Sequence, residues 1–576
     1  MPDGNIIQTS SDTDMNTLSP TQSVVGEVLR IGLLINSFEV QKWMYDIVKD
    51  LIGLQYCKIS LIIKNRAPAP QPETIPRLIK RNQRNLLFGL YTRLDYRLFR
   101  AIEDPFKPVD LFPLVEGIPI LEVEPVMKKY SDVLQSEDLN KIKEHNLDLA
   151  LRFGFRLLKG EILAIPRYGV WSFHHGDNRV NRGGPAGFWE VIDSVPITGA
   201  VLQIINEDLD NGRVIHRAYY KTHKRSYKLN RINIILKSAK SVVNKVEQLA
   251  RLGSIALEDP NSNGNIRPYS KPLYKIPNNR QMAIGLLKLT SRYIRDKLME
   301  PFERVQWFLS YKFNYKSTEP DQIFFRFRKI LPPEDRFYAD PFPVLHAGEY
   351  YIFFEEYVWK DNRGYISVIK LDEKGDPGSV QRVLELPYHI SYPFVFKWHE
   401  EYFMIPETLA SHRMDLYRCI EFPVRWELYR TLMDNIDAVD TTLFERDGRW
   451  WMFTSLDSGG GSFNDELYLF HAENPLGHWI PHPMNPVKTD VRSARCAGRL
   501  FELKGELYRP AQDYTIRYGG GMSINRVDIL STRQYKEEVV ARIAPEWDRD
   551  LIGTHTFNHQ QNLTVIDCLR RYWRLN

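Results

Sequence analysis

The sequence predicts a multidomain protein in which an α/β region is followed by an all-β region. Short continuous apolar runs at Val28–Asn36 and Cys57–Ile63, separated by a helical pattern, are typical of parallel strands covered by helices on both faces. Beyond about Asp321, short alternating strands rich in Tyr, Phe and Trp follow one another closely. At 576 residues the chain is too long for one hydrophobic core, so two or three domains are expected.

Composition is that of an ordinary globular protein. A formal charge of +5 over this length does not indicate nucleic-acid binding. The 4 cysteines lie far apart, in no metal-ligand or disulfide spacing, so we expect a reduced, cytoplasmic compartment and no metal. Residues 1–27 are polar and are expected to form a disordered tail rather than a signal peptide. No apolar run reaches the roughly 20 residues that a transmembrane helix needs.

The α/β pattern is expected over residues 28–255. Further strands are predicted at Ile118–Val123, Leu147–Gly154 and Gly169–Phe173, with a helix around Ser136–His145. In an open α/β sheet, ligands bind beyond the carboxyl ends of the strands, and the last of these strands runs directly into a polar stretch.

That polar stretch, residues 171–215, has an unusual density of turn and titratable residues. It contains His174, His175, Asp177, an Arg-Gly-Gly-Pro turn at 182–185 and an Asp-Leu-Asp-Asn-Gly turn at 208–212. Such residues between apolar runs indicate loops that hold chemistry on a rigid sheet, although a satisfied core histidine with ordinary turns is the alternative. A metal site from the two histidines and Asp177 is disfavoured, because neighbouring strand residues point to opposite faces.

A basic segment between residues 77 and 100 interleaves arginine and lysine with leucine. Such a charge run is either a solvated helix face or a contact for a phosphorylated substrate, a partner or an anionic surface.

The motifs of residues 171–215 together resemble the formyltransferase domain shared by methionyl-tRNA, glycinamide ribonucleotide and sugar N-formyltransferases. A strand followed by x-His, an Arg-Gly-Gly turn, T-G-x-x-L-x-x-I and L-D-x-G occur in the family's order, and the resemblance covers about Val28 to Ala250. It implies a Rossmann-like formyltransferase domain that uses 10-formyltetrahydrofolate as the formyl donor. On this resemblance His174 matches the family's histidine and Asp210 its aspartate.

One position departs from the family pattern, because Ser172 stands where the family has an asparagine. The asparagine amide would polarise the formyl carbonyl, and a single oxyanion donor is typically worth ~3 kcal/mol. Ser172 can donate one hydrogen bond, and Asn178 or Asn181 are alternative donors from the loop. A non-catalytic descendant of the family is therefore a second interpretation.

The expected roles follow from the chemistry of formyl transfer to an amine. His174 is assigned as the acid/base and Asp210 as the residue that fixes its tautomer or relays a proton, with Ser172 beside them. Asp208, Thr198 and Gly199 are expected to contact the donor. His175, Asp177 and Arg182 are expected to contact the substrate.

Residues 256–320 are expected to form a linker and a bridging helix, the helix over Gln281–Met299. A repeat of roughly fifty residues then fills residues 321–576, each copy containing a strand, a turn and a strand. Five copies predict a five-bladed β-propeller. The copies begin near Asp340, Tyr392, Asp440, Arg495 and His555.

This half is similar to the propellers of arabinanase- and xylosidase-type glycoside hydrolases, and to the propeller region of plant glucosamine inositolphosphorylceramide transferases. A glycosidase needs two carboxylates on either side of one bond, ~5 or ~6.5–9.5 Å apart. Candidates are Asp340 and Asp440, with Glu355, Glu356 or Glu407 behind them. The favoured interpretation is that both aspartates are structural, and that a mixed funnel binds glycan.

Three functions therefore stand: a formyltransferase acting on an amino sugar or glycoconjugate, a propeller glycosidase, and a glycan-binding protein without chemistry. A tRNA acceptor is disfavoured, because the basic domain that follows the catalytic domain in tRNA formyltransferases has no counterpart in this sequence.

Overall fold

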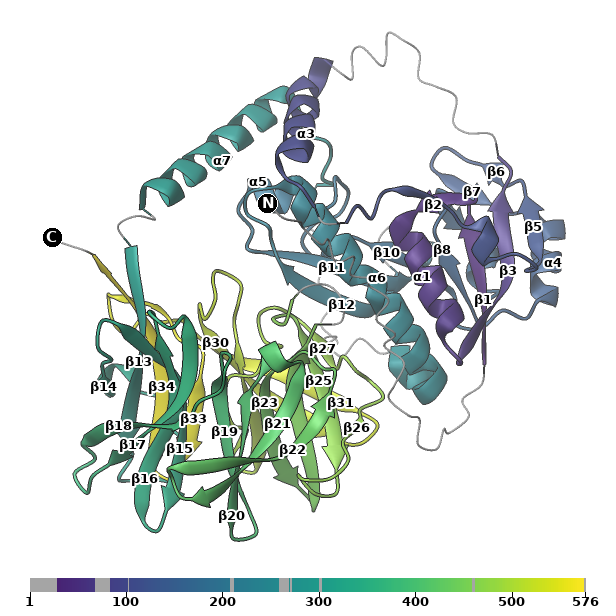
Figure 1. Cartoon of the computed structure of the whole chain (residues 1–576). Coiled ribbons are helices and arrows are strands. Elements are labelled where there is room, and N and C mark those ends of the chain that lie inside the picture. Colours follow the sequence, from purple (N-terminus) through teal and green to yellow (C-terminus); the bar gives the residue numbers. More distant parts are fainter. Residues whose placement is uncertain are drawn as a thin grey trace, which may run out of the picture.

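The computed structural model describes residues 28–67, 83–101, 103–207, 212–257, 269, 272–299, 303–457 and 462–573. The tail expected at residues 1–27, the first part of the basic segment and most of the expected linker lie outside these residues. Within them, an α/β half is followed by an all-β half (Figure 1).

The α/β half is organised on a seven-stranded sheet of order β12-β11-β10-β8-β1-β3-β5. The strands are β1 (Leu29–Ile35), β3 (Cys57–Asn65), β5 (Ile120–Val123), β8 (Leu149–Arg152), β10 (Val170–His174), β11 (Ile197–Ile204) and β12 (Arg213–Lys221). The pairs from β10 to β5 are parallel, whereas β10, β11 and β12 pair antiparallel. The predicted strands at Val28–Asn36 and Cys57–Ile63 are thus confirmed, because a strand buried on both faces is apolar at nearly every position.

Helices cover both faces of this sheet. On one face, α1 (Lys42–Gly53) and α6 (Tyr227–Leu252) bury their apolar stripes in a common core with β1, β3 and β8. On the other face, α4 (Ser136–Glu144) buries Leu139 and Ile142. Smaller elements complete the half: β2 (Glu39–Gln41), β4 (Pro108–Asp110), β6 (Val126–Met127), β7 (Ser131–Val133), β9 (Leu157–Lys159), α3 (Leu86–Leu98) and α5 (Phe188–Ile192).

A long helix, α7 (Asn279–Met299), leads from the α/β half to the all-β half (Figure 1). It confirms the helix predicted over Gln281–Met299. The next strand, β13 (Glu303–Phe313), lies within the stretch expected to be linker, and pairs along its whole length with β34 (Leu563–Trp573). Its partner is some 250 residues away in the sequence, so its local pattern alone did not reveal the strand.

In the described part of the chain, the all-β half consists of five antiparallel sheets. One combines β13 and β14 (Arg328–Ile330) with β32 (Leu551–Gly553), β33 (Phe557–Gln560) and β34. The next two are β15 (Arg336–His346), β16 (Glu349–Val358), β17 (Arg363–Leu371) and β18 (Pro377–Leu384), then β19 (Ser391–Trp398), β20 (Glu401–Glu407), β21 (Arg413–Glu421) and β22 (Arg425–Asp434). The last two are β23 (Ala438–Arg446), β24 (Arg449–Leu456), β25 (Glu466–Ala472), β26 (Ile480–Pro481) and β27 (Lys488–Thr489), then β28 (Phe501–Leu503), β29 (Glu506–Gln512), β30 (Met522–Leu530) and β31 (Tyr535–Ile543).

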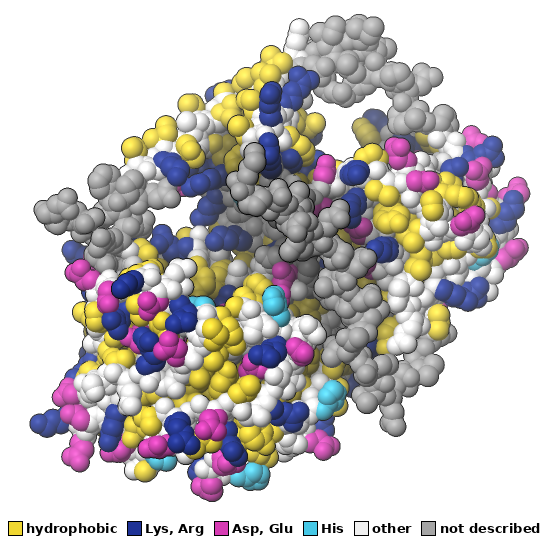
Figure 2. Space-filling view, in the orientation of Figure 1, with side chains coloured by type: hydrophobic (Ala, Val, Ile, Leu, Met, Phe, Trp, Pro, Cys, Tyr) yellow, Lys and Arg dark blue, Asp and Glu magenta, His cyan; other side chains and the backbone are white. Residues whose placement is uncertain are grey.

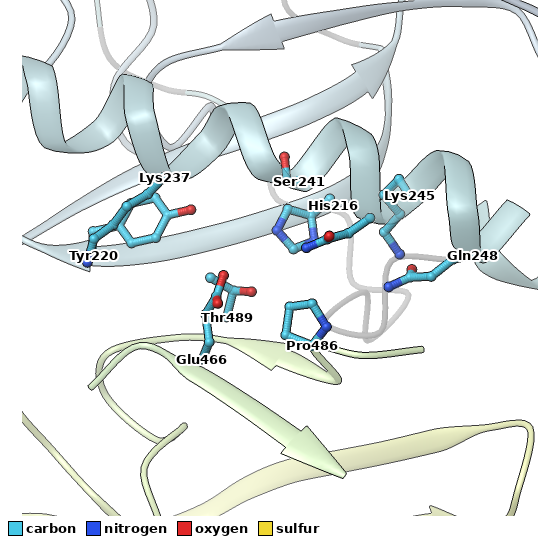
Figure 3. Close-up of a pocket in the computed structure, with 10 residues that line it drawn as sticks. His216, Tyr220, Lys237, Ser241, Lys245, Gln248, Glu466, Pro486 and Thr489 are labelled. Carbon is cyan, nitrogen blue, oxygen red and sulfur yellow. The ribbon is translucent and has the colours of Figure 1, made fainter. Parts of the chain in front are cut away.

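The two halves pack against each other through α6 and β12. Gln248 Nε2 donates to the carbonyls of Met484 at 2.9 Å and Asn485 at 3.2 Å, and the backbone N–H of Val491 donates to Tyr219. Figure 3 shows the small cavity between α6, β12 and the all-β half. Its volume of about 10 Å³ has room for about one water molecule, so this junction is a packing contact rather than a substrate site.

Among the described residues, no helix is both long and apolar enough to cross a membrane.

Candidate functional site

The end of β10 places Ser172 and His174 on the same face of the sheet, as the period of two along a strand requires. The Ser172 hydroxyl is buried and accepts hydrogen bonds from Arg152 Nε at 3.1 Å and Nη2 at 2.9 Å. Arg152 is the last residue of the neighbouring strand β8. The position that departs from the family pattern is therefore coupled to a guanidinium group.

Arg152 lines a cavity of about 350 Å³ beside β8 and β11. Gln203, the cross-strand partner of Ser172, lines it too. Other lining residues are Lys128, Lys129, Tyr130, Ser131, Leu157, Leu158, Lys159, Ile205, Asn206, Glu207 and Gly212. Three lysines and an arginine against one glutamate give the cavity a positive potential, which suits a ligand with carboxylates or phosphates.

Two residues that border this cavity, Glu207 and Gly212, precede and follow residues 208–211, which include Asp208 and Asp210. Both aspartates lie outside the described residues. Their expected roles at the donor and at His174 therefore stay predictions.

His174 lies against the loop that follows β10. Its Nε2 is 3.0 Å from the carbonyl oxygen of Asn181, and a carbonyl can only accept, so Nε2 holds the proton in the neutral ring. Nδ1 is then the basic nitrogen. The Asn181 amide donates to Glu190 Oε1 at 3.0 Å, and burial raises the pKa of Glu190.

His175 points to the opposite face, as strand geometry predicts. Its ring stacks on Phe173 with centroids 5.4 Å apart and meets Trp43 edge-on, and Ser238 Oγ lies 3.3 Å from its Nδ1. Desolvation among these groups lowers the pKa of His175 to about 3, so the ring is neutral. His175 is thus a packing residue, placed on the other side of the strand from Ser172 and His174.

Asp177 fixes the loop after β10. Its carboxylate accepts from Arg217 Nη1 at 2.6 Å and from the Tyr219 hydroxyl at 3.2 Å. Arg217 also donates to Asn178 Oδ1 at 3.0 Å. Asn178 and Asn181 were both considered as replacements for the missing asparagine, and both are engaged elsewhere: the Asn178 amide oxygen by Arg217 of β12, and the Asn181 amide nitrogen by Glu190 of α5.

The remaining landmarks of the formyltransferase pattern are also built into the fold. Thr198 is buried, with its hydroxyl 2.8 Å from that of Thr222. A Cβ added to Gly199 would lie 2.8 Å from the Asp177 Cβ, so glycine allows β11 to approach the loop. Arg182 donates through Nε to the Asn178 carbonyl and covers the Tyr269 ring at 4.7 Å. These residues hold the loop in place beside the strand end.

In the all-β half, three residues at matching positions adopt the left-handed backbone conformation. Asp340, Tyr392 and Asp440 have φ of 51°, 44° and 53°, each at an irregularity in the first strand pair of its sheet. Left-handed conformations are strained for residues other than glycine and are retained where a function or the surrounding structure demands them.

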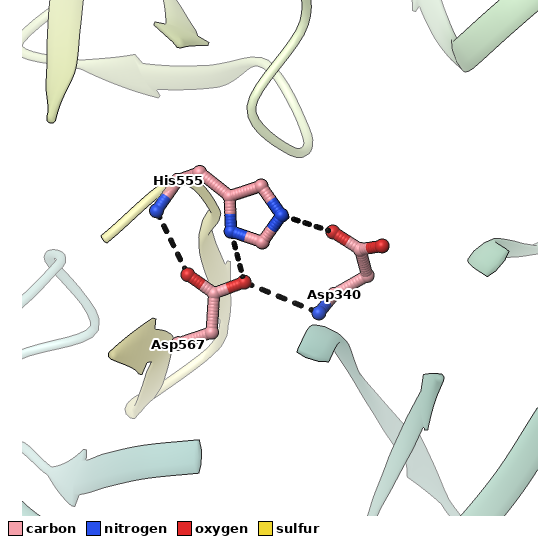
Figure 4. A group of neighbouring side chains, drawn as sticks. All are labelled: Asp340, His555 and Asp567. Carbon is pink, nitrogen blue, oxygen red and sulfur yellow. Dashed lines mark hydrogen bonds and ion pairs between the residues drawn. The ribbon is translucent and has the colours of Figure 1, made fainter. Parts of the chain in front are cut away.

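Asp340 belongs to a buried triad with His555 and Asp567 (Figure 4). His555 Nδ1 lies 2.7 Å from Asp567 Oδ2, and Nε2 lies 3.4 Å from Asp340 Oδ1. Desolvation opposes the charge on His555, but the two carboxylates outweigh it and raise its pKa. Asp567 also accepts the backbone N–H groups of His555 and Asp340, so the triad ties the strand ends together. The three side chains could hold a metal ion by their spacing.

Asp440 is paired instead with Arg495. Arg495 Nε lies 2.5 Å and Gln512 Nε2 lies 2.6 Å from the same carboxylate oxygen of Asp440. Two side-chain donors thus hold this carboxylate in a buried site.

The three glutamates behind these aspartates differ from one another. Glu356 pairs with Arg336 at 2.6 Å and accepts from Ser367. Burial, followed by neighbouring acidic groups, raises the pKa of Glu355 above its usual range. Burial raises the pKa of Glu407 to about 8, with the charge of Asp440 as the next cause.

Sequence reasoning missed Arg152, Gln203 and Glu190 in the α/β half. Arg152 ends an apolar strand, which is a weak signal for an inward-facing charge. Asp567 was missed because it lies at the middle of the last strand, far from any turn.

Comparison with known proteins supports relationships for parts of the chain. Residues 331–562 match the family "Glucosamine inositolphosphorylceramide transferase 1, N-terminal". The rice (Oryza sativa subsp. japonica) glucosamine inositolphosphorylceramide transferase 1 is 36% identical over 205 residues, which are 35% of this chain and 27% of that protein. The chain therefore spans about a quarter of the length of this relative.

A methionyl-tRNA formyltransferase of Prochlorococcus marinus is 29% identical over 143 residues, covering 24% of this chain and 40% of that enzyme. The chain is thus similar to transferases of two kinds. Among solved structures, the catalytic domain of a GH62 α-L-arabinofuranosidase from Coprinopsis cinerea has a TM-score of 0.32 at 13% identity, covering 45% of this chain and 97% of that one.

Proposed function

We propose that the chain is a formyltransferase that moves a formyl group from 10-formyltetrahydrofolate to an amine of an amino sugar or glycoconjugate. The observation that supports this most is the Ser172–Arg152 pair at the edge of the cationic cavity, on the sheet face that also presents His174. The likeness to a methionyl-tRNA formyltransferase supports the reaction type. The likeness to a glucosamine inositolphosphorylceramide transferase supports a glycoconjugate acceptor.

In this proposal Arg152 replaces the missing asparagine as the hydrogen-bond donor to the oxyanion. The acceptor amine attacks the formyl carbon, and the carbonyl oxygen becomes an oxyanion. A guanidinium beside that oxygen stabilises the charge more strongly than a neutral amide, because charge-assisted hydrogen bonds are about twice as strong. Ser172 holds Arg152 through two hydrogen bonds, so serine is the residue that fits here.

His174 moves the proton. The amine loses a proton to Nδ1 as it attacks, and the same proton passes to N10 of the folate as the bond between N10 and the formyl carbon breaks. The products are the formylated amine and tetrahydrofolate, so atoms and charges balance. Asp210, the aspartate that the formyltransferase resemblance assigns to the site, would orient the ring or relay the proton.

The positive charge of the cavity is complementary to the negative charge of 10-formyltetrahydrofolate. Tetrahydrofolate ends in glutamate carboxylates, and Lys128, Lys129 and Lys159 line the wall of the cavity. The aromatic side chain of Tyr130 is also part of this wall and offers a surface for a flat ring system.

For the all-β half we propose a five-bladed propeller that binds the glycan part of the acceptor, with domains near 28–255 and 321–576 together with β13. The pairing of β13 with β34, which joins the beginning and the end of this half, supports a closed ring. Tyr518 as a residue is 49% exposed, and its hydroxyl lies 3.4 Å from His555 Nε2, so an aromatic residue that could contact a sugar lies next to the Asp340 triad.

Donor binding tests the first step of this proposal. We would titrate the full chain with 10-formyltetrahydrofolate by calorimetry and compare it with Lys128→Gln/Lys129→Gln. The variant should bind about tenfold more weakly, since each lysine contributes one charge contact near the surface. Lys58→Gln/Lys316→Gln, two exposed lysines away from the cavity, is the matched control. Equal affinity of all three proteins would place the donor elsewhere.

A further inference from the structure

The helix α3 has a leucine face that is exposed. Leu86, Leu90, Leu94 and Leu98 recur every four residues and are 54%, 46%, 59% and 73% exposed. Residues four apart lie on one side of a helix, so these side chains form a continuous stripe. The basic segment noted in the sequence therefore contains an apolar face as well as a charged one.

The opposite face of α3 packs against the rest of the α/β half. Phe88 packs edge-on against Phe188, and Leu87 and Tyr91 belong to the same cluster. Asp95 is buried and accepts the backbone N–H of Lys228 at 2.7 Å. The contacts that hold α3 on the fold therefore do not involve the exposed leucines.

The helix α7 repeats this arrangement. Its inner face is anchored by Met282, which is buried, and by Gly285, where an added Cβ would lie 2.9 Å from Ile192. Its outer face presents a second apolar stripe. This stripe contains Ile284, Leu287, Ile294 and Leu298, which are 48%, 72%, 50% and 65% exposed.

The two helices are joined at their N-terminal ends. Asn279, the first residue of α7, accepts from the backbone N–H of Leu87 at 3.0 Å and donates to the carbonyl of Gln83 at 2.6 Å. Figure 2 shows hydrophobic side chains along the outer edge of this helix pair, with Lys and Arg side chains among them. α7 extends ~30 Å from this joint, so its stripe is long and narrow and begins beside α3.

Positive charges accompany both stripes. On α3, Arg93 and Arg97 are exposed beside the leucines, whereas the one acidic residue of the helix, Asp95, is buried. On α7, Lys288 and Arg295 lie beside the stripe; each has an acidic partner, Asp193 and Asp296, yet their side chains are 53% and 69% exposed. An apolar stripe bordered by Arg and Lys is the pattern of helices that lie in a membrane interface.

We propose that the outer faces of α3 and α7 bind the surface of an anionic lipid bilayer, with the helices parallel to the membrane plane. The leucines and isoleucines would enter the acyl boundary while the arginines and lysines contact lipid phosphates. A second copy of this chain is the poorer occupant, because it would bring its own arginines against these. The inference does not depend on the proposed formyl transfer.

Vesicle co-sedimentation of the full chain tests this inference. The chain should bind vesicles of phosphatidylcholine mixed with phosphatidylserine, bind pure phosphatidylcholine more weakly, and be released by salt. Leu94→Glu/Leu287→Glu should reduce binding about tenfold or more. Because both side chains are exposed, the variant should fold normally, as circular dichroism would show.

The matched control is Leu428→Glu/Ile480→Glu, which changes two leucine- or isoleucine-sized side chains of comparable exposure in the all-β half. It should bind vesicles like the unaltered chain. Equal binding by both variants, or failure of the unaltered chain to bind anionic vesicles, would overturn the proposal. So would a chain that is a dimer by sedimentation and becomes monomeric only in the α3/α7 variant, since the face would then be an interface between copies.

Discussion

Under the proposed formyl transfer, a serine at position 172 in place of an asparagine would leave the contact with the oxyanion to Arg152. The hydroxyl is too short to reach far beyond the strand end, but it holds Arg152 at the cavity wall through two hydrogen bonds. The sequence could indicate that Ser172 and His174 share a face, because strand periodicity is local. It could not indicate Arg152, which is twenty residues away and becomes a neighbour only when β8 pairs with β10.

Replacing Arg152 by Gln should therefore lower kcat for formyl transfer about 100-fold, the usual effect of losing one oxyanion donor. Acceptor KM should change little, because the contact forms in the transition state. Steady-state kinetics would measure both, with Arg167→Gln, an exposed arginine, as the control. A kcat within threefold of the unaltered chain would remove Arg152 from the mechanism.

Glu407 provides a prediction on pH. Burial raises its pKa to about 8 in the folded chain, so between about pH 5 and 8 the folded state holds a proton that the unfolded state releases. The stability that the protonated Glu407 contributes is fully present below the pKa of a glutamate in the unfolded chain, and it is lost as the pH rises toward 8. Glu407→Gln, which stays neutral, should gain stability relative to the unaltered chain over this range, by roughly 1 kcal/mol or more. Denaturant unfolding at several pH values would show it.

The exposed residue Glu427 supplies the control, because Glu427→Gln should leave the pH dependence of stability unchanged. If Glu407→Gln and the unaltered chain have parallel pH profiles, the Glu407 carboxyl does not hold a proton at neutral pH.

At the level of elements, the loop after β10 has its most crowded glycine at Gly183. Gly183 has φ of 102°, and a Cβ there would lie 2.3 Å from the Tyr274 carbonyl oxygen. Gly183→Ala should destabilise the chain by roughly 1–3 kcal/mol and displace the loop that holds Arg182. The neighbouring Gly184→Ala is the matched control, since nothing lies within 3.4 Å of its added Cβ. Thermal unfolding that moves equally for both variants would contradict this account.

The parallel strands and the helices α4 and α7 were predictable because their patterns are local. β13 was not, because its pairing with β34 joins distant parts of the sequence. The two-sided nature of α3 was also hidden, because apolar side chains lie on both of its faces and only the fold decides which face is covered.

At the level of the whole molecule, the two structural classes were predictable but their contact was not. α6 packs on the sheet of the α/β half, yet its Gln248 donates to two carbonyls of the all-β half. Gln248→Met would leave these buried carbonyls without their donor, at a cost of ~1–3 kcal/mol. Denaturant unfolding should show this loss, and Gln381→Met, at an exposed strand position, should show almost none. Equal stability of the two variants would mean that the halves are joined by other contacts.

Formyl transfer itself is the most direct test of the proposed function. The full chain would be incubated with 10-formyltetrahydrofolate and a panel of nucleotide-linked amino sugars and glucosamine-containing glycolipids, and the products analysed by mass spectrometry. The account predicts that one acceptor gains a single formyl group, that tetrahydrofolate forms in equal amount, and that His174→Ala abolishes both. A formylated product that forms equally with His174→Ala, or no formylated product from any acceptor by a chain that binds the donor, would contradict it.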